Sequence, residues 1–146
     1  MSLATDSIFV AALRGNSDLM DRIGSRLYST AIPLPDEDAD NVPVPYIIVT
    51  FDGLNNEQTT KDNPFESDED SVNISILCAA ANRESLAELM QEIRTTVYEY
   101  MLEQRRIGVY LVDDYTLSAD AVQYDSFKPC YWQTLRYVCD VTNTFD

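Results

Sequence analysis

Histidine is absent from the 146-residue chain, and this removes the commonest general base and the commonest zinc ligand together. Glycine is scarce, and its four residues lie far apart, at positions 15, 24, 53 and 108. The sequence therefore has no glycine-rich loop of the kind that holds phosphate groups. No apolar run approaches the ~18–20 residues that cross a bilayer. These absences exclude several classes of site but name no function.

Cysteine is also rare, with three residues and no CxxC spacing. Cys78, Cys130 and Cys139 each lie in or beside an apolar, strand-like run. We expect buried, reduced thiols, with a disulfide or a reactive thiol as the alternatives. The N-terminus has no basic segment followed by an apolar stretch, so we predict no secretory signal and synthesis in a reducing cytoplasm.

Basic residues are few. Ten Lys and Arg stand against 25 Asp and Glu, which gives a formal net charge of −15 and a pI near 4.1. This balance argues against binding to nucleic acid or to an anionic membrane, since both favour a basic face. The apolar fraction of 45% and the charged fraction of 24% are typical of a globular chain. The length predicts a single domain over residues 1–146.

Three helices are predicted from the spacing of apolar residues. Two short ones cover residues 7–14 and 18–23. Between them Gly15 and Asn16 give a stop that tolerates a positive φ, and Ser17 caps the second helix. The long one covers residues 83–103, begins after the N-cap residue Asn82, and repeats apolar residues every three or four positions.

Strands are predicted over residues 26–30, 46–51, 72–78, 107–112, 121–127 and 131–142, with Gly108 interrupting the fourth. The proline-rich, acidic segment 33–45 is a predicted loop. For the polar segment 52–67 we expect either a long hairpin excursion or a mobile loop. This order favours an α+β fold, with a mostly antiparallel sheet and one long and one or two short helices packed on one face.

Catalysis has little support in the residue types. Without histidine, neither a Ser–His nor a Cys–His pair can form. The acidic runs at 36–40, 68–70 and 113–114 could bind Ca²⁺ or Mg²⁺ through oxygen ligands, but none has the calcium-loop pattern. We interpret them as solvated loops and predict no catalytic residue, no cofactor-binding residue and no metal site.

Tyrosine is frequent, with nine residues, of which seven lie in the second half of the chain. Packing at half-buried sheet positions is the favoured explanation, and a protein interface is the alternative. Trp132 is predicted to lie on the sheet face opposite Leu135 and Tyr137. If no helix covers that face, Trp132 is a candidate interface anchor.

Several segments in a fixed order carry a resemblance to a known family. Residues 18–28 form a short helix, a glycine and an Arg-Leu-Tyr strand entry, and residues 44–49 read Val-Pro-Tyr-Ile-Ile-Val. The strand at 72–76, the small-residue turn at 79–82 and the segments at 123–125 and 133–138 follow. Together they resemble the tail-completion, or tail-terminator, proteins of bacteriophages, prophages and related tail-like particles. The acidic loop at 36–40 and the insertion at 52–70 are longer and more acidic than that family's pattern.

The resemblance implies a structural protein and not an enzyme. Members of the family form a ring, usually a hexamer, on the end of a completed tail tube, where it stops polymerisation and presents a surface to the head–neck connector. The implied partners are copies of the chain, the tail-tube protein and the connector, with no specific nucleic-acid binding and no membrane. The implied location is the virion tail, assembled in the host cytoplasm. Candidate interface or lumen residues are Asp36, Glu37, Asp38, Asp40, Glu66, Asp68, Glu69, Asp70 and Trp132.

Six copies at −15 each would carry −90 formal charges. We hypothesise that the acidic loops at 36–40 and 66–70 face the lumen of the ring and repel passing DNA. Unchanged, negligible DNA retention by rings with both runs neutralised would contradict this. Such a ring should also weaken at low ionic strength, where carboxylates repel without screening, and light scattering across a salt series tests it.

The sequence leaves open two alternative functions from other classes of protein. An acidic inhibitor or nucleic-acid mimic fits the net charge, although its acids should align on one face, and pull-down against basic partners tests it. An enzyme dependent on a divalent cation would use Asp113 and Asp114, and predicts stabilisation against heat by the metal.

Overall fold

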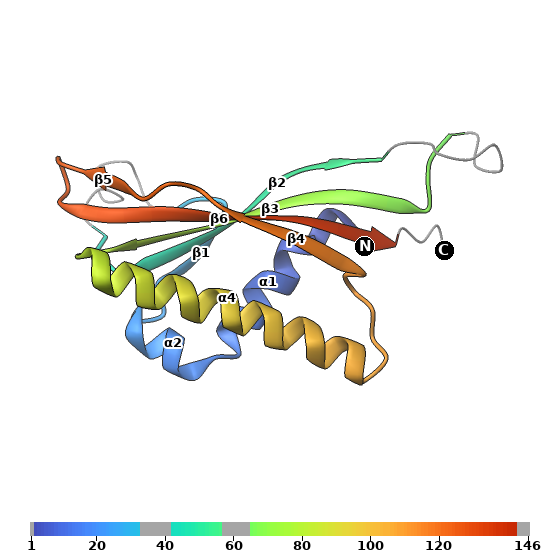
Figure 1. The fold of residues 1–146 in the computed structure, drawn as a ribbon, viewed down its shortest axis with the longest axis horizontal. Coiled ribbons are helices and arrows are strands. Elements are labelled where there is room, and N and C mark those ends of the chain that lie inside the picture. Colours follow the sequence, from blue (N-terminus) through green and yellow to red (C-terminus); the bar gives the residue numbers. More distant parts are fainter. Residues whose placement is uncertain (1, 33–41, 57–64, 143–146) are drawn as a thin grey trace.

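The computed structural model describes residues 2–32, 42–56 and 65–142, which form a layer of helices on one side of a sheet (Figure 1). The helices are η1 (Ser2–Ala4, a 3₁₀ helix), α1 (Thr5–Arg14), α2 (Ser17–Arg22) and α4 (Arg83–Arg106). The strands are β1 (Leu27–Ser29), β2 (Tyr46–Asn55), β3 (Glu69–Ala80), β4 (Asp114–Ala119), β5 (Gln123–Asp125) and β6 (Cys130–Thr142).

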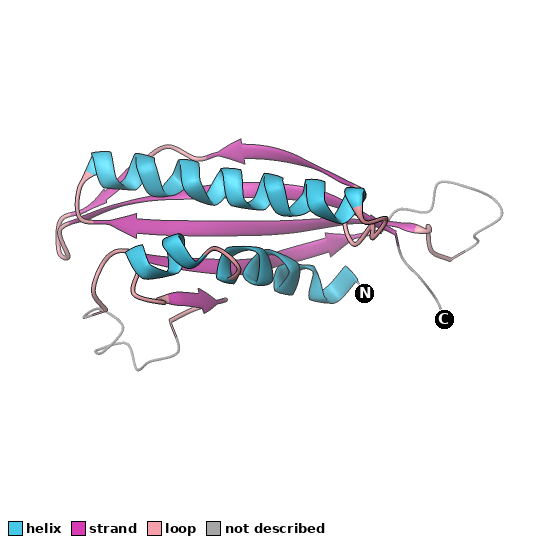
Figure 2. Cartoon of the chain, turned by 90° about the horizontal axis from the view of Figure 1, so that it is seen from below, coloured by secondary structure: helices cyan, strands magenta, loops and turns pink. Residues whose placement is uncertain are grey.

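The sheet has the strand order β1-β2-β3-β6-β4, and β5 also pairs with β6. The first pair, β1 and β2, is parallel, and the other pairs are antiparallel. Helices α1, α2 and α4 all lie on one face of the sheet (Figure 2). The predicted α+β class, with a mostly antiparallel sheet and its helices on one face, is confirmed.

Strict alternation along the two central strands decides which side chains meet the helices. The register pairs Ile74 with Tyr137 and Ile76 with Leu135, and all four side chains are buried. The Tyr137 ring contacts Phe9 of α1 at 5.0 Å between ring centroids and Tyr115 of β4 at 5.1 Å. Each large apolar side chain buried in this way contributes about 1.5–3 kcal/mol. The core therefore joins α1, the sheet and its edge strand β4.

The predicted strand at 107–112 is wrong, and Gly108 explains why. Gly108 has a φ of 77° and follows the C-cap Ile107 of α4. Its N–H donates to the Arg105 carbonyl at 3.2 Å, and the Val109 N–H donates to the Gln104 carbonyl at 2.8 Å. These two bonds define a Schellman motif, in which glycine ends a helix. The glycine that seemed to interrupt a strand therefore terminates α4, and the strand begins later, at Asp114.

Three smaller differences follow from caps and strand edges. Helix α2 is capped by Asn16 instead of Ser17, and Gly15, which tolerates a positive φ, has a φ of −71°. The Asn16 side chain accepts a hydrogen bond from the Leu19 N–H at 3.1 Å. The predicted strand at 121–127 is reduced to the three residues of β5. Helix α4 begins after the Asn82 cap as predicted and extends three residues further, to Arg106.

Candidate interaction surfaces

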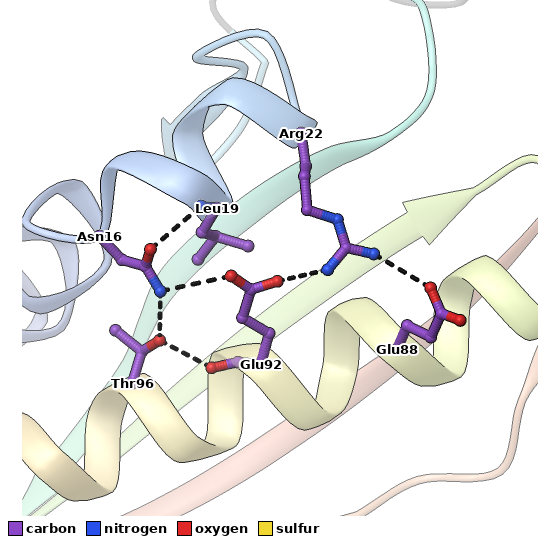
Figure 3. Close-up of polar contacts among 6 residues, drawn as sticks. All are labelled: Asn16, Leu19, Arg22, Glu88, Glu92 and Thr96. Carbon is purple, nitrogen blue, oxygen red and sulfur yellow. Dashed lines mark hydrogen bonds and ion pairs between the residues drawn. The ribbon is translucent and has the colours of Figure 1, made fainter.

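One flank of α4 is closed by polar contacts with α2, and Figure 3 shows the residues that make them. The Asn16 amide donates to the Thr96 hydroxyl at 2.9 Å and to Glu92 at 3.4 Å. The Arg22 guanidinium pairs with Glu92 at 2.5 Å and with Glu88 at 3.3 Å. The arginine lies between two carboxylates one helical turn apart and offsets the mild repulsion that like charges have at this spacing. The polar side chains on this flank of α4 are therefore paired with residues of the same chain.

The opposite flank of α4 is open, and a groove runs between it and β4. A hollow of about 400 Å³ lies between α4 and the start of β4. Its lining residues on α4 are Tyr98, Met101, Leu102 and Arg105, and those on the other side are Val112, Asp113, Asp114 and Tyr115. The groove continues toward the start of α4, where its lining residues are Gln91, Arg94, Thr95 and Leu117. Tyr98 is 54% exposed and Leu102 is 45% exposed.

Further apolar side chains surround this groove. The connection from α4 to β4 exposes Ile107, Val109, Tyr110 and Leu111 to solvent. Exposed apolar residues scattered singly are ordinary, but a contiguous group of them marks a surface that another molecule covers. We name the groove together with this connection the α4–β4 flank.

The strand beside the groove is also an edge of the sheet. In the described part of the chain β4 pairs on one side only, with β6, and its other side has no neighbouring strand. Its sequence, Asp-Tyr-Thr-Leu-Ser-Ala, contains neither the lysine nor the proline that often protects an edge strand. Its outer backbone groups therefore remain available to a further strand.

Carboxylates gather at one end of the sheet, on the face without helices. The register places Asp114 opposite Asp140, and Thr142 donates its hydroxyl to Asp113 at 2.6 Å. The hydrogen bond and negative charge of Asp114 raise the pKa of Asp140 above its ordinary value. Partial burial, and then a hydrogen bond and repulsion from Asp113, raise the pKa of Glu69. Among described residues no group of side chains is arranged to hold a metal ion.

The acidic residues predicted as candidates from the sequence differ in their exposure in the structure. Glu66, Asp68 and Glu69 are exposed. Asp70 is buried, with 4% of its surface exposed, and accepts a hydrogen bond from the Asn56 amide at 2.6 Å. The remaining four candidates, Asp36, Glu37, Asp38 and Asp40, lie outside the described residues.

Trp132 lies on the face opposite Leu135 and Tyr137, as predicted. The register places it beside Ala79 of β3 and Gln123 of β5, and its side chain is half-buried. No described helix covers this face, but nearby Val42 is buried, its carbonyl accepts a hydrogen bond from Lys128, and Lys128 lies 5.3 Å from the centre of the Tyr46 ring. Trp132 therefore lies in a surface that the chain itself partly covers.

The three cysteines are free and buried, as the sequence predicted. Burial raises the pKa of both Cys78 and Cys139 to about 12. Thiols that are both inaccessible and protonated are unreactive, which favours a packing role for these residues.

Sequence reasoning did not find the α4–β4 flank, although α4 carries a signal for it. Arg94, Tyr98, Leu102 and Arg105 recur at four- and three-residue spacing beside the main buried stripe. Such a second stripe, aromatic and basic, is typical of a helix that contacts another molecule.

No protein-family model matches the chain, and no curated protein sequence matches it. Within the described residues, none of the helices has the length and apolar character needed to cross a membrane.

Proposed function

We propose that this chain is a structural protein that caps a phage tail tube as a ring, ends tail polymerisation and forms the joint to the head–neck connector. The sequence resemblance supplies the biological setting. The single structural observation that supports it is the difference between the two lateral flanks of the molecule.

A closed ring needs two different complementary patches on each subunit, because each copy meets one neighbour on either side. A self-complementary patch would instead close a two-fold dimer. Here one lateral flank offers the groove and the edge of β4, and the other offers α1, α2 and the edge of β1 (Figure 2). The two flanks are unlike in shape and chemistry, which is what a head-to-tail ring requires.

The proposal is tested by removing the gene from the phage or prophage genome that encodes it. Without a cap to stop polymerisation, tail tubes should become variable in length and longer than normal, and they should lack attached heads. Electron microscopy of lysates measures both quantities, and a plasmid copy of the gene should restore normal particles. Tails of normal length with heads attached would contradict the proposal.

A further inference from the structure

We propose that the α4–β4 flank of one copy receives the α1–α2 flank of a second copy, so that subunits associate side by side and head to tail. This inference rests on the proposed function, because it names the contact from which the ring would be built.

Charge is the first argument for this pairing. Arg94 is exposed in the groove and forms no ion pair with any described residue. Asp18 and Asp21 are exposed on α2, and among the described residues they too have no charged partner. Opposite charges that are unpaired on opposite flanks attract two copies in one orientation and oppose the two pairings of like flanks.

The positions of these charges along the molecule also agree. Helix α2 contacts α4 at Glu88, Glu92 and Thr96, so it lies level with the part of α4 that carries Arg94. A second copy displaced sideways, without sliding along the long axis, would therefore bring Asp18 and Asp21 to the level of Arg94.

The ends of the two flanks also come level in this arrangement. The chain begins near the end of the molecule at which α4 ends, and both views show this (Figures 1 and 2). Leu3, in the first helical turn, is 73% exposed. The hollow around Tyr98 and Leu102 lies in the last part of α4. The sideways displacement would therefore bring the first helical turn of one copy level with the hollow of the next.

The sheet edges fit this arrangement as well. The strand order places β4 at one edge and β1 at the other. Side-by-side copies would bring the β4 edge of one copy toward the β1 edge of the next. Because the patches differ, the contact repeats from copy to copy and closes into a ring or continues as a filament.

Charge reversal and its rescue test the pairing. In Arg94→Glu, and separately in the double variant Asp18→Arg with Asp21→Arg, like charges face each other, and self-association should weaken by about tenfold or more. In the triple variant that combines these changes the charges are opposite again, and association should return to within about threefold of the unmodified chain. Sedimentation velocity and native mass spectrometry over a concentration series measure this, and thermal unfolding verifies that each variant is folded.

Arg83→Glu is the matched control. Arg83 is exposed on the same helix and makes no ion pair with a described residue, but it does not line the groove. Its reversal should leave self-association unchanged. Equal weakening by Arg83→Glu and Arg94→Glu would overturn the inference, since net charge alone would then explain both.

Disulfide trapping separates head-to-tail from two-fold association. The native cysteines are buried, so an introduced cysteine supplies the accessible thiol. Arg94→Cys and Asp21→Cys should each stay uncross-linked alone and form a disulfide-linked dimer when mixed. Dimers formed by Arg94→Cys alone would overturn the inference, and so would an unmodified chain that stays monomeric up to about 1 mM.

The two proposals can fail separately. If deletion of the gene lengthens the tails but the Arg94 variants associate normally, the function stands and this interface is wrong. If the charge rescue succeeds but deletion leaves the tails normal, the interface stands and the function is wrong.

Discussion

The two flanks of helix α4 differ in whether their side chains have partners within the chain. Toward α2, its polar side chains are bonded within the chain, through the Asn16 amide and the Arg22 guanidinium. Toward β4, Tyr98 and Leu102 stay exposed above a groove, and Arg94 has no ion pair with a described residue. The two flanks belong to one helix and differ only in what the rest of the chain supplies to them.

The difference teaches that composition alone does not decide which surface of a helix is left for a partner. Both flanks carry charged side chains, yet those of the α2 flank are paired within the chain, through Arg22 with Glu88 and Glu92. The β4 flank is more apolar and would gain more from being covered, at about 25 cal/mol for each Å² of apolar surface removed from water. Covering this exposed apolar surface by association would therefore be favourable.

Replacing Asn16 by Asp should have the largest effect, because it breaks the closed flank. An aspartate oxygen would still cap α2, but it cannot donate to Thr96, and it places a carboxylate where the amide nitrogen now lies 3.4 Å from Glu92. We expect Asn16→Asp to lower the free energy of unfolding by about 1–3 kcal/mol at neutral pH. Denaturant unfolding measures this, and the loss should shrink near about pH 4, where the introduced carboxyl takes up a proton.

Asn82→Asp is the matched control. Asn82 caps α4 by accepting from the Ser85 N–H at 2.8 Å, and its position is exposed. A carboxylate at this helix start meets the positive end of the helix dipole, so the substitution should be neutral or stabilising by up to about 1 kcal/mol. If both substitutions cost the same, capping explains the result and the bonds between α2 and α4 contribute little.

The sequence predicted the layers and the order of elements because both depend on local periodicity. The even-numbered apolar residues from Val72 to Cys78 and the stripe through Leu86, Leu89 and Ile93 are patterns that a single strand or helix reveals. The error at 107–112 has a different cause. Ile107 to Val112 is apolar enough for a strand, and only the hydrogen bonds around Gly108 show that the glycine ends a helix.

The candidate surfaces were less predictable because they depend on distant parts of the chain. Arg22 reaches Glu88 and Glu92 across about 70 positions of sequence, and helical spacing shows only two like charges one turn apart, not the arginine between them. The α4–β4 flank likewise needs the position of β4, which follows from its pairing with β6. The sequence alone shows the second stripe on α4, but it does not show that this stripe stays exposed beside β4.

The buried amide of Gln104 contrasts with the half-buried amide of Asn16. Neither the amide nitrogen nor the amide oxygen of Gln104, on α4, has a hydrogen-bond partner among the described residues, whereas the Asn16 amide donates to Thr96 and Glu92 and accepts from the Leu19 N–H. Methionine has a similar length and shape without the unsatisfied polar atoms. Gln104→Met should raise the free energy of unfolding by about 1 kcal/mol. Chemical denaturation measures it, and Gln91→Met, on an exposed position of the same helix, should change stability by less than about 0.5 kcal/mol. A loss of stability in Gln104→Met would show that the amide has a partner in solution.

The smallest effect concerns two pairs of like charges. Arg22 lies between Glu88 and Glu92, but Asp114 and Asp140 face each other with no cation paired to either in the described chain. The pKa of Asp140 is raised in the folded protein, so folding binds protons and stability falls as pH rises from the unfolded pKa through the folded one. The resulting loss of folding stability is complete above the folded pKa of Asp140, and it persists at neutral pH. It is relieved on acidification toward the unfolded value, at about pH 4.

Asp114→Asn removes the first cause of this raised pKa. It should therefore increase the free energy of unfolding at pH 7 by a few tenths of a kcal/mol, up to about 1, because both carboxylates are exposed to solvent. The gain should fade near about pH 3, where Asp140 is protonated in both the folded and the unfolded chain, and also in about 0.5 M salt, where exposed charges are screened. Glu99→Gln, on an exposed position of α4 without an ion pair to a described residue, should show no such gain. A gain of equal size in Glu99→Gln would mean that the net charge of −15, and not the Asp114–Asp140 pair, sets the pH dependence of stability.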